Sequence, residues 1–423
     1  MFSELKMWIG KLLICVALGT GLMLFVYALP TEAMRENVSR SSEIFDYEGV
    51  YPQLVNGYKY MQLDNYTDSI MLGAAIYDGN EGIINKAMKN YHIDCDDLSP
   101  ELALTNYSNH ADYDYYKVSY ERYWHGYLVP LKILLLFFDY ADIRVLNYIV
   151  QGILLITVIS LFYKAKLEKF STAFLCAILV INPMTTAVSL QYSSVYIILL
   201  LVVIYLLEMD IHHRIEVGKV SNLFFLVGVT TSFFDFFTYP FATFGFLIVL
   251  YINMKMDKLN NNEVSHRELI RYFVLWSIGY IGMWAGKWGV GSILLRENLF
   301  ANAMNQAMMR LSSQSVGLES YNRFETVLIN IRVLVKWPFV ILLLGALLFW
   351  MIGLKRNFFE NIKSNAKIVG IYLVIAIMPF VWIILLSNHS REHYWFTYKE
   401  LSVSCFAIIS LLTYLKKSRR NKM

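Results

Sequence analysis

The chain has 423 residues, of which 57% are hydrophobic and only 17% are charged, and this balance is too apolar for one soluble domain of that length. Aromatic residues are abundant, with 30 Tyr, 27 Phe and 9 Trp, as expected where many helix ends meet lipid headgroups. The apolar runs are unbroken and about 20 residues long rather than alternating, which excludes a transmembrane β-barrel. The sequence therefore predicts an all-α polytopic membrane protein.

Residues 1–29 are expected to hold a cytoplasmic N-terminus and the first transmembrane helix. The apolar run Leu12–Leu29 follows Lys6 and Lys11, and a signal peptide would show the same order of basic and apolar residues. The run is longer than the apolar region of a typical signal peptide, so we interpret it as an uncleaved first span.

Residues 30–144 are expected to form a large extracytoplasmic loop that contains interfacial helices. Most of this segment is polar, and acidic side chains outnumber basic ones in it. The apolar stretch Leu128–Phe138 is too short to span a bilayer and predicts a partly embedded helix. Cys95 is the only cysteine of the polar segment, so no disulfide is expected within it.

Residues 145–423 are expected to hold the remaining transmembrane helices of a total of about ten, an extracytoplasmic loop at about 289–336 and a basic cytoplasmic tail. With an even number of spans both termini are cytoplasmic, and Lys and Arg then collect in the short cytoplasmic segments, as the positive-inside rule requires. The expected spans are Val145–Tyr163, Phe170–Ala187, Tyr192–Leu207, Asn222–Phe234, Thr238–Ile252, Leu269–Lys287, Pro338–Gly353, Ile368–Ser387 and Tyr398–Leu415. Gly282 and Gly286 form a GxxxG pair, which predicts a helix-packing face.

The stretch Leu63–Tyr77 carries the first candidate site. Asp64 and Asp68 are four residues apart, so a helix would place both carboxylates on one face near its start. Asp64 is a good N-cap residue, and apolar residues follow at helical spacing. Two interpretations stay open at this point: an ordinary capped helix that packs on the membrane domain, or a helix that presents a carboxylate to a substrate.

The expected topology places further polar side chains on the same side of the membrane. Carboxylates come mainly from the early loop, and cations come mainly from the later loops. The candidate substrate-binding residues are Asp46, Glu48, Arg122, His125, Asp235, Arg310, Arg323, His389, Arg391, His393 and Lys399.

This separation of charge suits transfer of a sugar from a polyprenyl-phosphate donor. The phosphate leaves as an anion that cationic side chains can stabilise, and the acceptor hydroxyl needs a carboxylate to take its proton. Asp64 or Asp68 could supply that base. No cofactor and no metal site are assigned, although Asp46 with Glu48, or Asp96 with Asp97, leave a divalent metal as an alternative. The stretch His389–His393 matches a zinc-hydrolase pattern, but only Glu400 remains as a further acidic ligand, so we set zinc chemistry aside.

Two motifs resemble those of the GT-C superfamily of membrane glycosyltransferases. LDNYTDSIML resembles the acidic motif of the first external loop, with Asp64 at the position of the carboxylate. YWHGYLVPLKILLLFF resembles the second interfacial helix, with His125 and Pro130, and DIRVLN then supplies Arg144. The acidic pair of the superfamily is Asp64-Asn65 here, which leaves the choice between Asp64 and Asp68 open. The resemblance implies an inverting transferase of bacterial cell-surface polysaccharide assembly.

The expected partners are a lipid-linked sugar donor, a glycan or lipid acceptor and membrane lipids, with no nucleic acid. A polysaccharide polymerase is the alternative enzyme, since it also needs many spans and arginine-rich outer loops. A lipid-linked glycan flippase or transporter without transferase activity is the alternative from another class. A transporter should keep ionisable residues near the bilayer centre, whereas the charges here gather at the outer rim, which favours surface chemistry in the plasma (cell) membrane.

Overall fold

The computed structural model describes residues 2–258, 264–314, 320–336, 340–341, 344–345 and 358–417. Within these ranges the chain is mostly helical, and six helices are long and apolar enough to cross a membrane. This finding supports a helical membrane protein, while the total of about ten spans stays a prediction. The six are α1 (Phe2–Tyr27), α8 (Tyr140–Lys164), α11 (Leu190–Ile211), α12 (Val217–Phe234), α19 (Ala366–Leu385) and the helical run Tyr394–Lys416.

Two further expected spans correspond to long helices that are not among these six. The span expected at Thr238–Ile252 lies in α13 (Phe241–Lys258), and the span expected at Leu269–Lys287 lies in α14 (His266–Leu295). Both helices extend several residues beyond their expected apolar runs at one end or both. The span expected at Pro338–Gly353 falls largely outside the described residues.

The apolar run expected to form one span at Phe170–Ala187 is divided between two helices. These are α9 (Glu168–Ile181) and α10 (Pro183–Val188). The break lies at Asn182, which adopts a left-handed conformation with φ of 64°, a region that Asn tolerates better than most residues. Pro183 then begins α10, where its missing N–H costs no helical hydrogen bond. The expectation of a single helix was therefore wrong at this point.

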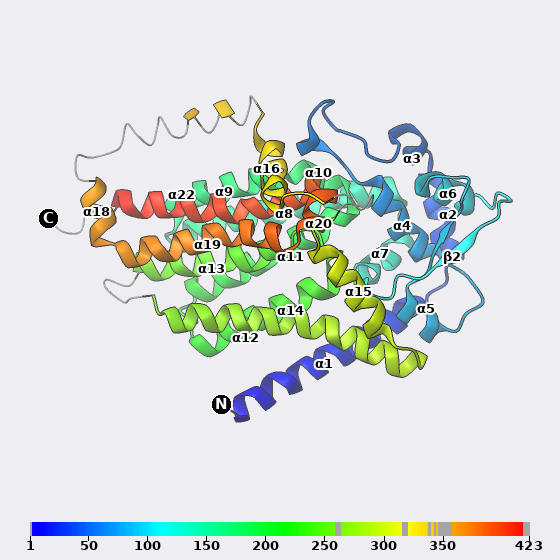
Figure 1. The fold of residues 1–423 in the computed structure, drawn as a ribbon, viewed down its shortest axis with the longest axis horizontal. Coiled ribbons are helices and arrows are strands. Elements are labelled where there is room, and N and C mark those ends of the chain that lie inside the picture. Colours follow the sequence, from blue (N-terminus) through cyan, green and yellow to red (C-terminus); the bar gives the residue numbers. More distant parts are fainter. Residues whose placement is uncertain are drawn as a thin grey trace.

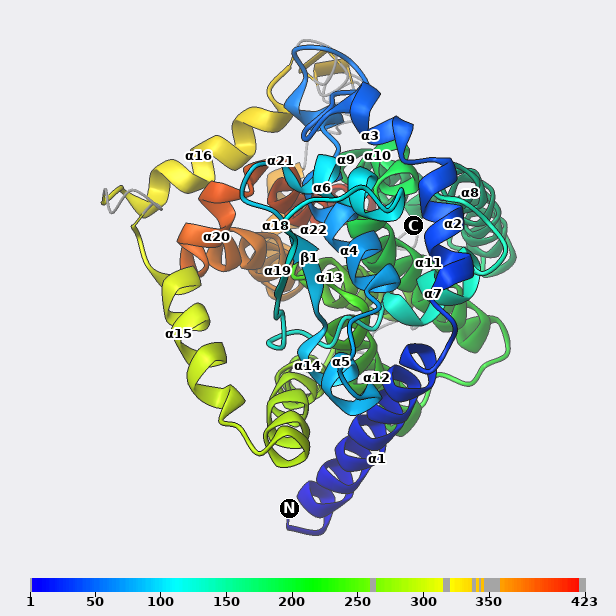
Figure 2. The ribbon, with the colours of Figure 1, turned by 90° about the vertical axis from the view of Figure 1, so that its right-hand side faces the viewer.

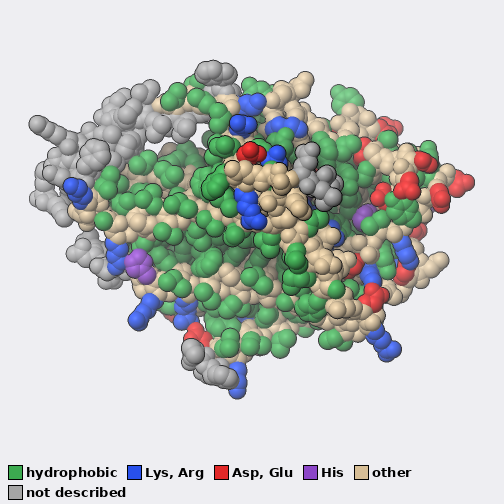
Figure 3. All heavy atoms as spheres, in the orientation of Figure 1, with side chains coloured by type: hydrophobic (Ala, Val, Ile, Leu, Met, Phe, Trp, Pro, Cys, Tyr) green, Lys and Arg blue, Asp and Glu red, His purple; other side chains and the backbone are tan. Residues whose placement is uncertain are grey.

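The segment between α1 and α8 folds into a head, defined here as residues 30–135, at one end of the helical bundle (Figures 1 and 2). Its two short strands pair antiparallel, with His92 opposite Val118. The head holds α2 (Glu32–Arg40), α3 (Glu43–Glu48), η1 (Lys59–Met61), α4 (Asn65–Ile76), α5 (Ile83–Lys89), β1 (His92–Asp94), α6 (Pro100–Ser108), β2 (Tyr116–Val118) and α7 (Leu128–Leu135). Figure 3 shows acidic side chains gathered over this end of the molecule.

Several short helices of the later part of the chain lie at the same end of the bundle as the head. Contacts between α16, α21 and η1 join this later part of the chain to the head, and Figure 2 shows α15, α16 and α20 beside it. The elements at this end are α15 (Leu299–Leu311), α16 (Arg323–Leu334), α20 (Ser387–Glu392), α21 (Tyr394–Thr397) and η2 (Tyr398–Glu400). In Figure 1, α18 (Phe358–Ser364) lies at the other end of the bundle, and α22 (Leu401–Lys417) runs along the bundle towards it.

Glycines set the closest helix contacts of the bundle. A Cβ atom on Gly228 of α12 would collide with the carbonyl oxygen of Trp276, and one on Gly279 of α14 would collide with the carbonyl oxygen of Phe225. The backbones of α12 and α14 therefore touch directly, as small residues permit at helix crossings in membranes.

The predicted packing role of the GxxxG pair is confirmed. Cβ atoms on Gly282 and Gly286 would meet the side chains of Leu12 and Val16, so this face of α14 packs against α1. The pair therefore joins the first helix of the chain to α14 in the middle of the sequence.

Replacing Gly279 by Ala should lower the thermal unfolding midpoint of the detergent-solubilised protein. The new methyl group meets backbone that cannot shift, and overpacking of this kind costs about 1–3 kcal/mol, which exceeds the gain of up to about 1 kcal/mol from better helix propensity. Gly289→Ala is the matched control on the same helix, because open space surrounds that position. Equal midpoints for the two variants would contradict the assigned contact.

Candidate functional site

Asp64 lies where the head meets the helical bundle. Its carboxylate accepts a hydrogen bond from the Thr67 backbone N–H at 2.9 Å, which confirms the prediction that Asp64 is the N-cap of α4. The residue is only 2% exposed. It is therefore a buried carboxylate at a helix N-terminus, where the helix dipole favours negative charge.

Burial raises the pKa of Asp64 to about 7, and the negative charge of Asp68 raises it further, while hydrogen bonds from Thr67 oppose the shift. The Trp395 indole also favours the ionised form of Asp64, although its N–H makes no full hydrogen bond with the described residues. A carboxyl group with a pKa near neutrality is well suited to accept a proton at physiological pH. Asp64 therefore has the electrostatic character of a general base.

Asp68 has a different environment, in which both oxygens are fully occupied. One oxygen accepts from the Tyr140 hydroxyl at 2.7 Å and the Leu190 N–H at 2.8 Å. The other accepts from the Gln191 N–H at 3.0 Å and the Ser189 hydroxyl at 3.1 Å. Asp68 thus fastens α4 to the first turn of α11. Its interpretation as the base is corrected, because no lone pair is left for a substrate proton.

Arg144 completes this buried joint. Its guanidinium binds both carboxylate oxygens of Glu48, at 2.7 and 2.9 Å, and also reaches the Tyr140 hydroxyl at 2.9 Å and the Asn65 side-chain oxygen at 3.3 Å. Glu48 is therefore an ion-pair partner rather than a substrate ligand. Asp46, which was also expected to bind substrate, is exposed on α3 and takes no part in this joint.

His389 and His393 form the second part of the site. Their rings lie 4.9 Å apart. His389 Nε2 meets the Phe237 carbonyl oxygen at 2.8 Å, and Arg310 Nη1 meets His393 Nε2 at 3.2 Å. Since a carbonyl only accepts and a guanidinium only donates, His389 carries its proton on Nε2 and His393 carries its proton on Nδ1.

Both histidines are neutral at physiological pH. Burial lowers the pKa of His389 well below its usual value and lowers that of His393 to about 3, and the charge of Arg310 acts in the same direction. The expectation that these imidazoles supply positive charge is corrected, and Arg310 alone brings it. Each ring keeps a buried Nδ1 atom with no hydrogen-bond partner among the described residues, as a donor on His393 and an acceptor on His389.

Trp395 joins the two parts of the site. Its ring centroid lies 5.3 Å from that of Tyr51 and 5.5 Å from that of His393, and its indole faces Asp64. The early carboxylate and the late cation Arg310 are thus connected through Trp395 and His393. The sequence interpretation overlooked Trp395, because Tyr51 and Asp64 are more than 300 residues away from it in the chain.

Arg323 and Arg391, both expected to bind phosphate, are used in local structure. Arg323 donates to the Leu311 carbonyl at 2.9 Å, at the end of α15. Arg391 lies 3.5 Å from the Glu325 carboxylate and covers the ring of Tyr321. The assignment of both residues to donor binding is therefore not supported by their contacts.

The assignment of Lys399 to substrate binding is also corrected, because this lysine caps a helix. Its ammonium group is buried and donates to the Ile181 carbonyl at 2.5 Å, the last residue of α9. Two other buried lysines behave in the same way: Lys132 donates to Ala75 O at 2.6 Å near the end of α4, and Lys287 donates to Met88 O at 2.9 Å near the end of α5. Cations at helix C-termini are stabilised by the helix dipole.

Two further expected residues, His125 and Arg122, lie in the head. His125 is held between the Tyr120 carbonyl at 2.8 Å and the Tyr127 hydroxyl at 2.9 Å, so both ring nitrogens are occupied and its substrate-binding assignment is not supported. Arg122 covers the ring of Tyr120 at 4.3 Å.

Asp235 lies at the end of α12. It accepts from the Thr238 backbone N–H at 3.1 Å and from the Thr238 hydroxyl at 2.6 Å, and burial raises its pKa to about 6. It therefore caps the turn that follows α12.

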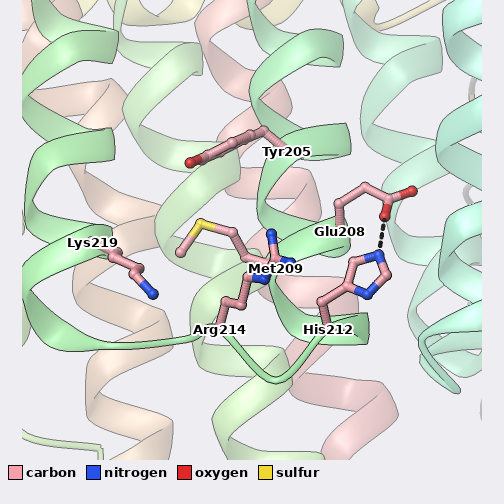
Figure 4. A pocket seen from close by; sticks show the side chains of 6 residues that line it. All are labelled: Tyr205, Glu208, Met209, His212, Arg214 and Lys219. Carbon is pink, nitrogen blue, oxygen red and sulfur yellow. Dashed lines mark ion pairs between the residues drawn. The ribbon is translucent and has the colours of Figure 1, made fainter.

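Two hollows lie away from Asp64. One has a volume of about 290 Å³ at the turn between α11 and α12, where His212 and Glu208 form an ion pair at 3.2 Å (Figure 4). The other has a volume of about 460 Å³ and is an apolar groove between α13, α14 and α19. Among the described residues, no group of three or more His, Cys, Asp and Glu side chains gathers to hold a metal ion.

The comparisons with protein families, curated proteins and solved structures found no match for this chain. Its function is therefore argued from the geometry of the site alone.

Replacing Asp68 by Asn should destabilise the protein more than replacing Asp64 by Asn. An amide at this position would turn its NH₂ group towards two of the four donors, and each lost hydrogen bond to a charged group is worth about 1.5–3 kcal/mol. Asp64 accepts only within its own helix turn. Thermal unfolding of both variants in the same detergent tests this order. If Asp68→Asn is more stable than Asp64→Asn, the assignment of Asp68 to the joint is contradicted.

The stability contribution of Asp64 should depend on pH. An ordinary Asp ionises near pH 4 when the chain is unfolded, whereas folded Asp64 holds its proton up to about pH 7. Between these values the folded state binds more protons, so stability from this group is present at low pH and is lost as pH rises towards 7. The unfolding midpoint of Asp64→Asn should therefore rise relative to that of the wild type between pH 5 and 7. Above pH 7 the difference between the two midpoints should be constant. A constant difference would show that the carboxyl ionises normally.

Proposed function

We propose that the protein is an inverting glycosyltransferase of GT-C type that moves a sugar from a polyprenyl-phosphate donor to a glycan or lipid acceptor. One observation carries this proposal: Asp64, a carboxylate with a pKa near 7, is joined through Trp395 and His393 to Arg310. A base and an anion-stabilising cation at one buried, aromatic-lined site are what such a transfer requires.

The proposed reaction uses each group once. Asp64 accepts the proton of the acceptor hydroxyl group. At the same time the oxygen of that hydroxyl group forms a bond to the anomeric carbon of the donor sugar. The bond between that carbon and the phosphate oxygen breaks, and both of its electrons leave with the phosphate. Arg310 stabilises the resulting charge, and the free Nδ1–H of His393 adds a hydrogen bond to it. One displacement with one base inverts the anomeric configuration.

The head is proposed to lie on the extracytoplasmic side of the cell membrane, with both termini in the cytoplasm. Its acidic surface (Figure 3) and the basic residues of the short segments at the other end of the bundle support this orientation. The polymerase and transporter alternatives find less support. The buried lysines in and beside the bundle are all bonded to helix carbonyls, so they do not form a path of free charges across the bundle.

Asp64→Asn should lose about 10²- to 10⁴-fold of the transfer rate while the protein stays folded, because a positioned base contributes about that much. The assay supplies undecaprenyl phosphate carrying a radiolabelled hexose to the full chain in nanodiscs, over a panel of hexoses, and follows label transfer and release of undecaprenyl phosphate. Arg310→Met should also lose activity.

Arg332→Met serves as the matched control, since Arg332 is an exposed arginine on α16. Full activity in Asp64→Asn, or consumption of none of these donors by the wild type, would contradict the proposal.

A further inference from the structure

Four aromatic residues surround Asp64, and the function proposed above uses none of their faces. Tyr51 and Tyr66 stack with a centroid distance of 6.2 Å and an interplanar angle of 15°. Trp395 meets Tyr51 at 5.3 Å with its edge turned by 60°. Tyr192 lies within electrostatic range of both Asp64 and Tyr51. We call these four rings the collar of Asp64.

Two rings of the collar are partly exposed. Tyr51 is 42% exposed and Tyr66 is 40% exposed, although each packs against another ring. Part of each ring is thus available to a ligand, while the nearby Asp64 is almost completely buried. An aromatic platform that leads down to a buried polar group is a common form of a small-molecule site.

Polar atoms without partners belong to the other two rings of the collar. The Tyr192 hydroxyl and the Trp395 indole N–H are buried and make no hydrogen bond with the described part of the chain. Buried polar groups are nearly always satisfied in native proteins, so these two atoms point to a ligand with hydroxyl groups that can both donate and accept.

Carboxylates surround the two exposed tyrosines of the collar, while Lys399 lies 4.9 Å from the ring of the buried Tyr192. Burial raises the pKa of both phenols, and carboxylates raise it further: Asp64 and Glu101 act on Tyr51, and Asp94 and Asp64 act on Tyr66. An anionic ligand, such as a phosphate or a carboxylated sugar, would be repelled here. A neutral ligand with hydroxyl groups fits both the charge and the aromatic faces.

We propose that the Tyr51, Tyr66 and Trp395 collar is the acceptor subsite and that it binds a neutral pyranose ring. One apolar face of the sugar packs on the tyrosines, and one of its hydroxyl groups points down to Asp64. This inference rests on the proposed transferase function, and it narrows the acceptor to a glycan with an uncharged terminal sugar rather than a lipid phosphate. Arg310 is connected to the collar through Trp395 and His393, so donor phosphate and acceptor sugar have separate places in the site.

Binding of simple sugars tests the subsite without any transfer reaction. The probes are methyl glucoside, methyl galactoside and methyl N-acetylglucosaminide in both anomeric forms, and saturation-transfer difference NMR on the full chain in nanodiscs detects weak binding. At least one glycoside should bind the wild type. Tyr66→Leu should weaken that binding about two- to tenfold, which is the usual worth of an aromatic contact, whereas Tyr66→Phe should keep it.

Tyr47→Ala is the matched control, because Tyr47 is 93% exposed in the same head and should leave binding unchanged. Equal binding in wild type and Tyr66→Leu, or no binding of any glycoside, would overturn the subsite even if Asp64→Asn abolishes transfer. Conversely, ring-dependent binding together with full transfer by Asp64→Asn would leave the subsite standing and remove the proposed base. Tighter binding of methyl glucuronide than of methyl glucoside would contradict the neutral-sugar assignment.

Discussion

The buried carboxylate of Asp68 holds the candidate site in place. It takes four hydrogen bonds, two of them from the first N–H groups of α11, so the start of a bundle helix is capped by a residue of the head. Because α4 carries Asp64 one turn earlier, this cap also fixes where Asp64 stands over the bundle. The ion pair between Arg144 and Glu48 then holds α3 against α8. Removing water from such a network makes each bond stronger and each missing partner more costly.

Other buried ionisable side chains also form hydrogen bonds at the ends of helices. Lysines 132, 287 and 399 lie at the C-terminal carbonyls of α4, α5 and α9. Glu400 accepts the N–H of Phe241 at the start of α13. In each case the hydrogen bond suits the helix end, because the lysines donate to C-terminal carbonyls and Glu400 accepts from an N-terminal N–H. A chain with few charged residues thus uses several of them to join short helices where water is excluded.

Much of the architecture near Asp64 could be predicted from the sequence. The helix at Asn65–Ile76, its N-cap and the glycine face of α14 all depend on neighbours within one or two turns, and the structure bears them out. Assignments that depend on distant partners were less accurate. Lys399 and Asp68 looked like site residues because a carbonyl or an N–H partner has no sequence signature. Trp395 was missed for the same reason, since nothing in the stretch 388–399 indicates that its ring faces Tyr51.

The glycine contacts between α12 and α14 have a mechanical consequence. Helices whose backbones touch gain close van der Waals packing and Cα–H···O contacts. Glycine at Gly279, Gly282 and Gly286 therefore sets how closely α12 and α1 can approach α14.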